Sequence, residues 1–319
     1  MERATALSAS ATAEVFERTR PLLFAIAYRM LGSVAEAEDI VQEAFLRYHR
    51  AVGGSEKEAV SSPKAYLVTV TTRLAIDQLR SARSRREQYV GQWLPEPVLS
   101  ADSQVERYAE LNESLSMAFL LLLERLSPVE RAVFLLREVF AYGHQEIAAM
   151  VGKSEANVRQ IAVRARRHVE GGRRRFQIAP AAQAELAGRF FTALQAGNVD
   201  DLMAVLAADV TMIGDGGGQA PALAEPATGR QRVARFLLGL ARLAARLELG
   251  LRLEQVNGEP GAVVVDPAGR VAAVVALEIA QGSVTAIRSV VNPDKLRHLG
   301  PVVNLGELMG PVRDQPDAS

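Results

Sequence analysis

Apolar side chains in the first half of the chain recur at helical spacing. They line one face of residues 13–30 and of 35–49, and a further helix of about 20 residues starts at Lys64. Ser33 with Glu36 forms a capping box, in which each residue satisfies a backbone N–H of the other at a helix start. The pattern predicts an all-helical module over residues 7–90, with more helix from about 103 to 126.

The pattern changes class beyond Pro180. Two helical stretches, 181–197 and 199–207, precede a short apolar strand at 210–213, and another helix is expected at 230–245. Four β-like runs follow, at 247–256, 262–266, 271–280 and 284–291. Asn257-Gly258 and Gln281-Gly282 are dipeptides typical of tight hairpins. Helices followed by an antiparallel sheet predict an α+β domain over residues 180–299, and the Gly/Pro-containing residues 300–319 predict a flexible tail.

A short segment between the helical regions cannot be helical. In Trp93-Leu94-Pro95-Glu96-Pro97 two prolines lack an N–H donor and push the residues before them toward extended backbone. We therefore predict a stiff linker within residues 91–110, and we expect the Trp93 indole to be buried against another part of the chain.

Residues 111–175 read as a second helical module that contains a helix-turn-helix. Ser127, Pro128 and Glu130 begin one helix, and Ser154 caps the last helix after a break at Gly152-Lys153. Val158, Ile161, Ala162, Ala165 and Val169 form the inner face of this last helix. Its outer face predicts DNA contact through amides and guanidiniums, although a solvated basic face is the alternative. The candidate DNA-contacting residues are Asn157, Arg159, Gln160, Arg164 and Arg167.

The net charge is zero, with 37 basic and 37 acidic residues, but the charges are segregated. Residues 159–175 hold seven arginines against one acid, and residues 73–86 hold five against Asp77. The chain from Pro180 onward has 12 basic and 15 acidic residues, a net of −3. Such local basic patches favour binding to a polyanion. Asp77 lies four residues after Arg73 and three before Arg80, so one carboxylate can orient both guanidiniums, unless these are plain surface ion pairs.

The outer face of the helix over residues 35–49 is acidic, with a leucine at its centre. This composition suits docking onto a basic partner surface, while a solvated face with a stray leucine is the alternative. Its members are Asp39, Gln42, Glu43 and Leu46.

Several kinds of chemistry are not expected. The absence of cysteine excludes disulfides, thiolate zinc sites and cysteine nucleophiles, and the four histidines make no ligand-spaced pair. We therefore expect neither a metal nor a cofactor. The N-terminus does not resemble a signal peptide, and no uncharged apolar run approaches about 18 residues, so a cytoplasmic protein without a membrane partner is expected.

Residues 10–170 resemble the extracytoplasmic-function sigma factors. Residues 35–46 match the region 2 helix that docks on core RNA polymerase in that family. Arg73, Asp77 and Arg80 match the end of region 2 that recognises the promoter −10 element, and Arg83 extends this basic stripe. The helix-turn-helix matches region 4, which reads the −35 element. Residues 51–62 lie where the family captures a flipped −10 base.

Three further motifs resemble a subgroup of these factors that carries a C-terminal SnoaL-like domain, thought to regulate the sigma modules in cis. We expect these motifs to meet in an interdomain regulatory contact. The chain departs from the subgroup at Gln219, where lysine is usual, and the glycines also fit a flexible loop. The motif residues are Trp93, Leu94, Pro95, Glu96 and Pro97; Asp215, Gly216, Gly217 and Gly218; and Asn292, Pro293, Asp294, Lys295 and Leu296.

The resemblance implies two sigma modules followed by an α+β SnoaL-like cone, with core RNA polymerase and promoter DNA as partners. One alternative is a helix-turn-helix regulator with a ligand-binding C-terminal domain, and a small ligand for that domain stays open. Another is a fused isomerase or cyclase that uses Asp209 and Asp215. Acid–base catalysis needs two groups within reach of a substrate, and His298 lies beyond the expected sheet, so we expect no enzyme.

Overall fold

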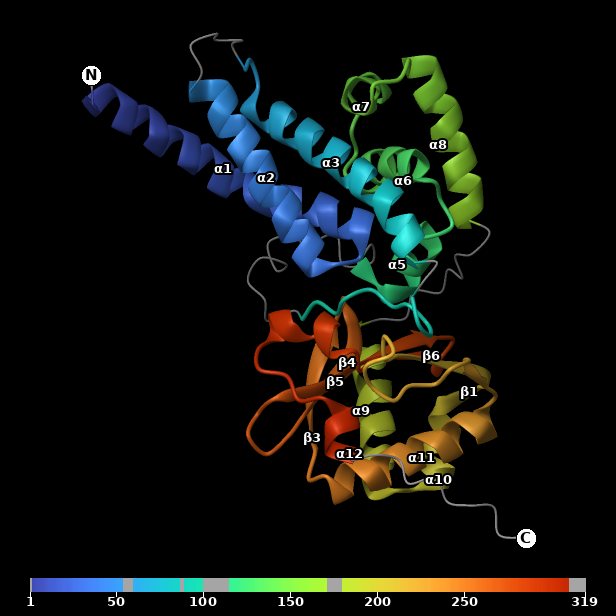
Figure 1. Cartoon of the computed structure of the whole chain (residues 1–319). Coiled ribbons are helices and arrows are strands. Elements are labelled where there is room, and N and C mark those ends of the chain that lie inside the picture. Colours follow the sequence, from blue (N-terminus) through green and yellow to red (C-terminus); the bar gives the residue numbers. More distant parts are fainter. Residues whose placement is uncertain (1, 54–59, 87–88, 100–114, 171–179, 310–319) are drawn as a thin grey trace. The chain divides into compact units, whose positions relative to one another are not determined.

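The computed structural model describes residues 2–53, 60–86, 89–99, 115–170 and 180–309 (Figure 1). Its chain divides into two units. Unit 1 comprises Met1–Glu87 and Ala101–Arg173, and unit 2 comprises Gln88–Ser100 and Arg174–Ser319. The predicted linker therefore groups with the C-terminal domain over the part that is described, up to residue 99.

Unit 1 begins with three mutually packed helices, α1 (Glu2–Leu31), α2 (Val34–Gly53) and α3 (Pro63–Arg86). The Ser33 hydroxyl accepts the N–H of Glu36 at 3.2 Å, as the predicted cap requires. The helix starting near residue 13 begins earlier, at Glu2. Its apolar stripe packs with that of α2, and the buried members include Leu23, Ile26, Ala27, Val41 and Ala44.

The second half of unit 1 contains the predicted helix-turn-helix. Its elements are α5 (Met117–Leu123), α6 (Pro128–Phe134), the π-helical turn η2 (Leu135–Val139), α7 (His144–Val151) and α8 (Glu155–Glu170). Ser127 and Glu130 form the reciprocal capping box. Gly152 ends α7 with φ 65°, a left-handed conformation that glycine adopts without steric cost. The first part of the predicted 103–126 helix lies outside the described residues.

Unit 2 combines helices with one six-stranded sheet. Its helices are α9 (Pro180–Ala196), α10 (Val199–Val205), α11 (Arg230–Arg246) and α12 (Leu305–Met309), with 3-10 turns η3 (Pro293–Lys295) and η4 (Arg297–Leu299). Its strands are β1 (Leu206–Asp215), β2 (Ala227–Thr228), β3 (Gly250–Val256), β4 (Glu259–Val265), β5 (Val271–Ala280) and β6 (Ser283–Val290), in the order β2-β1-β6-β5-β4-β3.

The sheet is mixed, which corrects the expectation of an antiparallel one. β3 to β6 form the predicted antiparallel meander, and both Asn257-Gly258 and Gln281-Gly282 have the positive φ values of tight hairpin turns. β1 is longer than predicted and lies parallel to β6. The chain passes through α11 and three strands before β6 returns beside β1, and a connection of this length permits parallel pairing.

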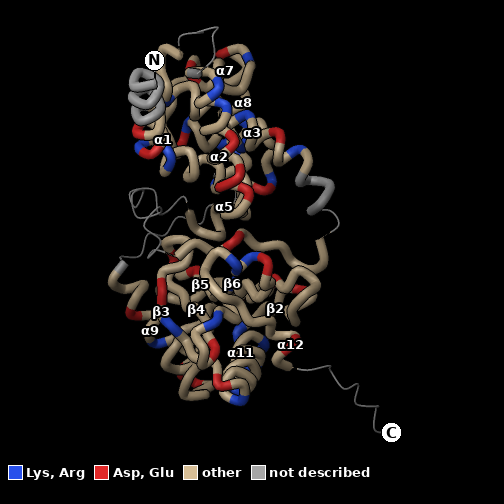
Figure 2. The backbone as a smooth tube through the Cα atoms, turned by 60° about the vertical axis from the view of Figure 1, so that its left-hand side comes forward, with Lys and Arg blue, Asp and Glu red and all other residues tan. Residues whose placement is uncertain are grey.

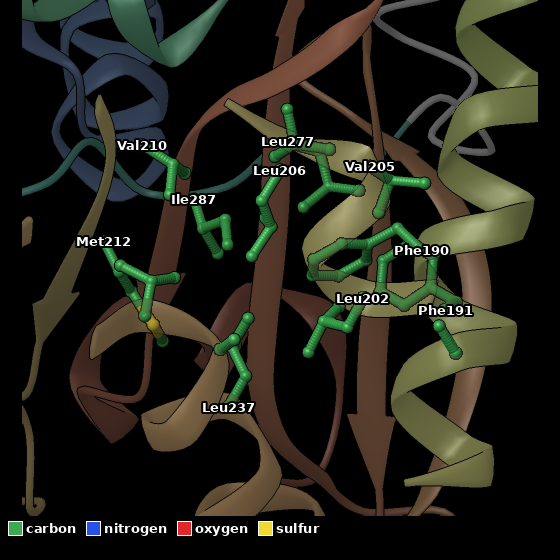
Figure 3. Close-up of a cluster of buried hydrophobic side chains, with 14 of the residues drawn as sticks. Phe190, Phe191, Leu202, Val205, Leu206, Val210, Met212, Leu237, Leu277 and Ile287 are labelled. Carbon is green, nitrogen blue, oxygen red and sulfur yellow. The ribbon is translucent and has the colours of Figure 1, made fainter. Parts of the chain in front are cut away.

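The core of unit 2 lies between the sheet and helices α9, α10 and α11 (Figure 3). Phe190 and Phe191 of α9 meet edge to face, with ring centroids 5.1 Å apart, and point toward apolar residues of the sheet. The labelled side chains that complete this core are Leu202, Val205, Leu206, Val210, Met212, Leu237, Leu277 and Ile287.

The prediction of a flexible tail from residue 300 is wrong for its first part. Val271 at the start of β5 donates to Pro301 and accepts from Val303 across 2.8 and 2.9 Å, and Val303 is buried. The tail therefore adds a short parallel bridge to the sheet, and α12 follows it. Residues 310–319 lie outside the described part. Among described residues, no helix has the length and apolar character to cross a membrane.

Candidate functional site

The outer face of α8 is arranged as predicted. Its inner face is buried, with Val158 and Ala165 fully covered, and all five candidate DNA-contacting residues are exposed. Arg159 pairs with Glu155 one turn earlier at 2.5 Å, and the guanidinium of Arg164 lies 3.8 Å from Glu130. Acids on α8 and α6 therefore orient two of the arginines while leaving them open to solvent.

The outer face of α2 also matches its prediction. Asp39 and Gln42 are exposed, and Leu46 is 40% exposed. Glu43 is half-buried and pairs with Arg47 at 2.7 Å. On the inner side the ring of Phe45 packs at a tilt against that of Phe16 of α1, with centroids 4.4 Å apart, which fixes the rotation of the helix. The surface thus presents a carboxylate, an amide and a leucine side by side.

On α3 the expected grouping is only half present. Asp77 pairs with Arg80 at 3.1 Å, as predicted. Arg73 instead turns to the helix-turn-helix: its Nε donates to the Met150 carbonyl at 2.8 Å and its terminal nitrogen to the Ala149 carbonyl at 2.9 Å. The prediction that Asp77 orients both arginines is therefore wrong for Arg73. Arg83 lies in α3, but its side chain is outside the described part.

The physical reason lies at the end of α7. A helix leaves its last carbonyls without intrahelical donors, and these carry the negative end of the helix dipole. The planar guanidinium of Arg73 supplies two donors and a positive charge at that point. The Asp77 carboxylate is exposed and solvated by water, so it attracts the Arg73 guanidinium less strongly than the end of α7 does. Arg73 thereby ties the first helical module to the second.

A cleft of about 340 Å³ lies beside the loop predicted to capture a base. Residues of α1 and the start of α3 line it: Val15, Arg18, Thr19 and Leu22, with Ser62, Pro63 and Lys64. Residues 54–59 of the loop lie outside the described part. The sequence offered no signal for this cleft, because its two walls are about 45 residues apart in the chain.

The three motifs of the linker and the C-terminal domain meet in unit 2, around the carboxylate of Asp215. This residue ends β1 and is fully buried. Its Oδ2 accepts the N–H of Leu94 and the ammonium of Lys295, both at 2.7 Å, and its Oδ1 accepts the hydroxyl of Tyr89. Lys295 also donates to the carbonyl of Leu94. Asp215 and Lys295 therefore hold both polar groups of one linker residue, and we call this arrangement the linker latch.

Aromatic rings enclose the buried cation of the latch. The Lys295 ammonium lies 4.4 Å from the Trp93 ring centroid and 4.8 Å from that of Tyr89. A desolvated ammonium over an aromatic face is attracted by the ring quadrupole. The Trp93 indole packs against this lysine but is only half-buried, which falls short of the predicted burial, whereas Leu94 beside it is fully buried.

Asn292 and the glycine loop shape the same site. The Asn292 amide donates to the Tyr89 hydroxyl at 2.9 Å, and its Oδ1 accepts the N–H of Asp294 at the start of η3. Gly217 has φ +58°, and a Cβ there would lie 2.1 Å from the Asn292 amide nitrogen. The glycine run is therefore required by close packing. Gln219, which departs from the subgroup pattern, donates to Asp294, so an uncharged donor stands where lysine would form an ion pair.

The rest of the linker is held by residues that the sequence did not single out for this role. The ring Nε2 of His298 lies 2.7 Å from the Pro97 carbonyl. Asn257 exchanges two hydrogen bonds with Val98, at 3.0 and 2.7 Å, and Leu99 bridges to Val256. Asn257 carried only a turn signal. Tyr89 carried none, because its role depends on Asp215, 126 positions away.

The electrostatics of the latch favour a neutral tyrosine. Burial raises the pKa of the Tyr89 hydroxyl, and its hydrogen bond to Asp215 and the charge of that carboxylate raise it further. The two acids considered for catalysis differ in burial. Asp209 is exposed on β1, whereas Asp215 is buried beneath the linker residues that it binds.

Two family models match the helical part of the chain. Residues 15–85 match the Sigma-70 region 2 family and residues 116–169 match Sigma-70 region 4. The ECF RNA polymerase sigma factor SigJ of Mycobacterium tuberculosis is 40% identical over 290 residues, which cover 88% of this chain and 91% of SigJ. The chain belongs to the extracytoplasmic-function sigma factors.

Other matches to this sigma factor extend over the C-terminal domain as well. The probable ECF sigma factor SigI of Mycobacterium tuberculosis is 33% identical over 279 residues, with 87% of this chain and 92% of SigI covered. The crystal structure of SigJ aligns with a TM-score of 0.71 at 35% identity, over 89% of this chain and 98% of that one. Two helical sigma modules followed by an α+β domain, as predicted, are therefore confirmed.

Proposed function

We propose that this sigma factor directs core RNA polymerase to promoters with −10 and −35 elements, and that its C-terminal domain restrains it in cis through the linker latch. The exposed face of α2, with Asp39, Gln42 and Leu46, supports the role of polymerase contact. α8 supports −35 reading. Asp77 and Arg80 toward the end of α3 support binding at −10, and the separate cleft at the start of α3 lies beside the loop expected to capture a base. A protein with these partners acts in the cytoplasm.

The latch is the observation that carries the regulatory part. A linker peptide whose N–H and C=O are both bound by a buried ion pair cannot move without exposing that pair. Removing one partner of a buried ion pair typically costs about 3–5 kcal/mol, far more than a surface contact. The latch thus gives the C-terminal domain a firm hold on the only segment that joins the two sigma modules.

Promoter geometry explains why such a hold would restrain activity. Elements at −10 and −35 are about 25 bp apart, or about 85 Å at 3.4 Å per base pair. Arg73 ties α3 to α7, so the two modules must separate before both elements are engaged. Holding residues 89–99 on the C-terminal sheet limits the linker length available for that separation. Docking the linker therefore favours the closed arrangement of the modules.

Point variants of the full chain test this proposal in a transcription assay reconstituted with core polymerase. Asp215→Asn and Lys295→Gln should each raise transcription from a cognate promoter. Arg252→Gln serves as the control, because this exposed arginine of β3 pairs with Glu254 on its own strand and lies in the same unit. Unchanged transcription would contradict cis regulation by the latch, and reduced transcription would mean that the docked linker assists initiation.

A separate measurement tests the sigma function itself. Substituting Asp39, Gln42 and Leu46 together should abolish capture of the chain by core polymerase and leave the latch intact. A protein that binds its duplex site without any polymerase contact would instead be a conventional helix-turn-helix regulator.

A further inference from the structure

The outer face of α11 carries a row of arginines that neither the sigma modules nor the latch uses. Arg232, Arg235, Arg242 and Arg246 are all exposed. At about 100° per residue they fall within about 80° of the helix circumference, and they extend over about 21 Å of its axis. Figure 2, which colours Lys and Arg blue, shows blue positions on α11. We call these four residues the α11 arginine row.

The opposite face of α11 fixes the row in place. Val233, Ala234, Leu237 and Leu238 are buried in the core of unit 2. The apolar side of the helix is therefore occupied by the sheet, and it cannot enter a membrane interface as a free amphipathic helix would. The arginines stand on a rigid support and face solvent.

The charge of the row is not balanced locally. The sequence has no acidic residue between Glu225 and Glu248. Within the described part of the chain, none of the four guanidiniums forms an ion pair, and Arg235 bonds only to the Gln231 carbonyl of its own helix. By contrast, Arg252, Arg270 and Arg288 on the strands and turns of this net-negative unit each pair with an acid.

Gly239 leaves open space within the same face of α11. It lies at the centre of the row, exposed, and a Cβ there would meet nothing within 4 Å. Glycine inside a helix costs about 1 kcal/mol relative to alanine, and internal packing does not require it here. A missing side chain between arginines lets a ligand backbone come close to the helix.

We infer that the α11 arginine row is a third DNA-contacting surface, which binds the phosphate backbone without reading sequence. The row consists of guanidiniums, which hold phosphates well, and a surface of phosphate contacts positions DNA and does not specify it. A duplex carries about one phosphate charge per 1.7 Å of axis, so about 12 charges lie along 21 Å. The inference goes beyond the proposed function and does not depend on the latch.

The test measures binding of the full-length chain to a cognate promoter duplex and to a scrambled duplex of equal length, across a salt series. The variant Arg235→Gln/Arg242→Gln is compared with Arg252→Gln/Arg270→Gln, which removes the same charge from ion-paired positions. Since each lost phosphate contact lowers the slope of log K against log salt by about 0.9, the α11 variant should lower it by about 1.8 on both duplexes. The control variant should leave the slope unchanged.

Three results would overturn the inference. Unchanged slopes in the α11 variant would mean that the row is only solvated. Equal slope losses in both variants would mean that net charge matters and the position on α11 does not. Weakened capture by core polymerase with an unchanged DNA slope would assign the row to a protein contact. Melting temperatures of both variants confirm that each remains folded.

Discussion

Two carboxylate–cation pairs in this sigma factor have similar lengths and opposite surroundings. Lys295 and Asp215 are 2.7 Å apart, with side chains 9% and 0% exposed, whereas Arg80 and Asp77 are 3.1 Å apart and 62% and 71% exposed. Water screens the second pair, so it is worth at most about 1 kcal/mol. The pair on α3 can therefore exchange its partner for a DNA phosphate at little cost. The buried pair cannot, and this makes it suitable as a latch.

The largest expected effect comes from breaking the buried pair. Lys295→Ala leaves the Asp215 carboxylate buried without its cation. It should weaken linker docking and lower the free energy of unfolding of unit 2 by about 3–5 kcal/mol. Trp93 is the only tryptophan of the chain and lies on Lys295, so its fluorescence during urea titration reports the loss directly.

The exposed pair supplies the contrast in a urea titration of unit 1, followed by helical circular dichroism because Trp93 lies in unit 2. Asp77→Ala should change the free energy of unfolding by no more than about 1 kcal/mol. Similar losses in both variants would mean that burial does not separate the two pairs, and the comparison would fail.

Alanine substitutions at two glycines, Gly217 and Gly239, should have the next largest effects on stability. Gly217→Ala places a methyl group in a left-handed backbone position and against Asn292, and it should cost about 1–3 kcal/mol of linker docking. Gly239→Ala has open space and ordinary helical backbone, so it should raise stability by about 0.5–1 kcal/mol. Thermal unfolding followed by Trp93 fluorescence and by circular dichroism measures both changes. A stable, fully docked Gly217→Ala variant would show that the loop adapts.

Two arginines of α3 also differ in their contacts. Arg73 bonds to another helix of the protein, whereas Arg80 makes a solvent-exposed ion pair. Arg73→Ala removes two hydrogen bonds to α7 and should cost about 1 kcal/mol of contact between the sigma modules, whereas Arg80→Ala loses only a screened pair. The chain has no cysteine, so a fluorophore pair can be introduced at Gln42 and Gln160. Arg73→Ala should broaden the distance distribution between these positions. An equal change in Arg80→Ala would exclude a specific role for Arg73.

Local patterns predicted the elements of this fold well, because caps, turns and helical stripes depend on neighbouring residues. Ser127 with Glu130, Gly152, and the inner face of α8 all follow from spacings of one to four positions. Contacts between distant segments were predicted only where a family motif marked them, as at Asp215 and Lys295. The bond from Arg73 to α7, the role of Tyr89 and the parallel β1–β6 pairing have no such signal. They depend on how finished elements pack, and sequence spacing does not encode this.

The smallest expected effect concerns Glu130, whose side-chain exposure lies between those of Asp215 and Asp77. Burial raises the pKa of Glu130, but hydrogen bonds from the hydroxyl and N–H of Ser127 and the charges of His168 and Arg164 outweigh this, so the net pKa is lowered. A lowered folded-state pKa contributes stability above the ordinary value of 4.5, and this contribution is lost as the pH falls through the folded value. Glu130→Gln should therefore cost roughly 0.5 kcal/mol at neutral pH, the lower end for a helix cap, and less at acidic pH. Urea unfolding of both proteins at several pH values, followed by circular dichroism, measures the difference. A difference that grows as the pH falls would mean that the ionised cap is not what stabilises α6, and Glu130 would then belong with the screened surface charges of α3.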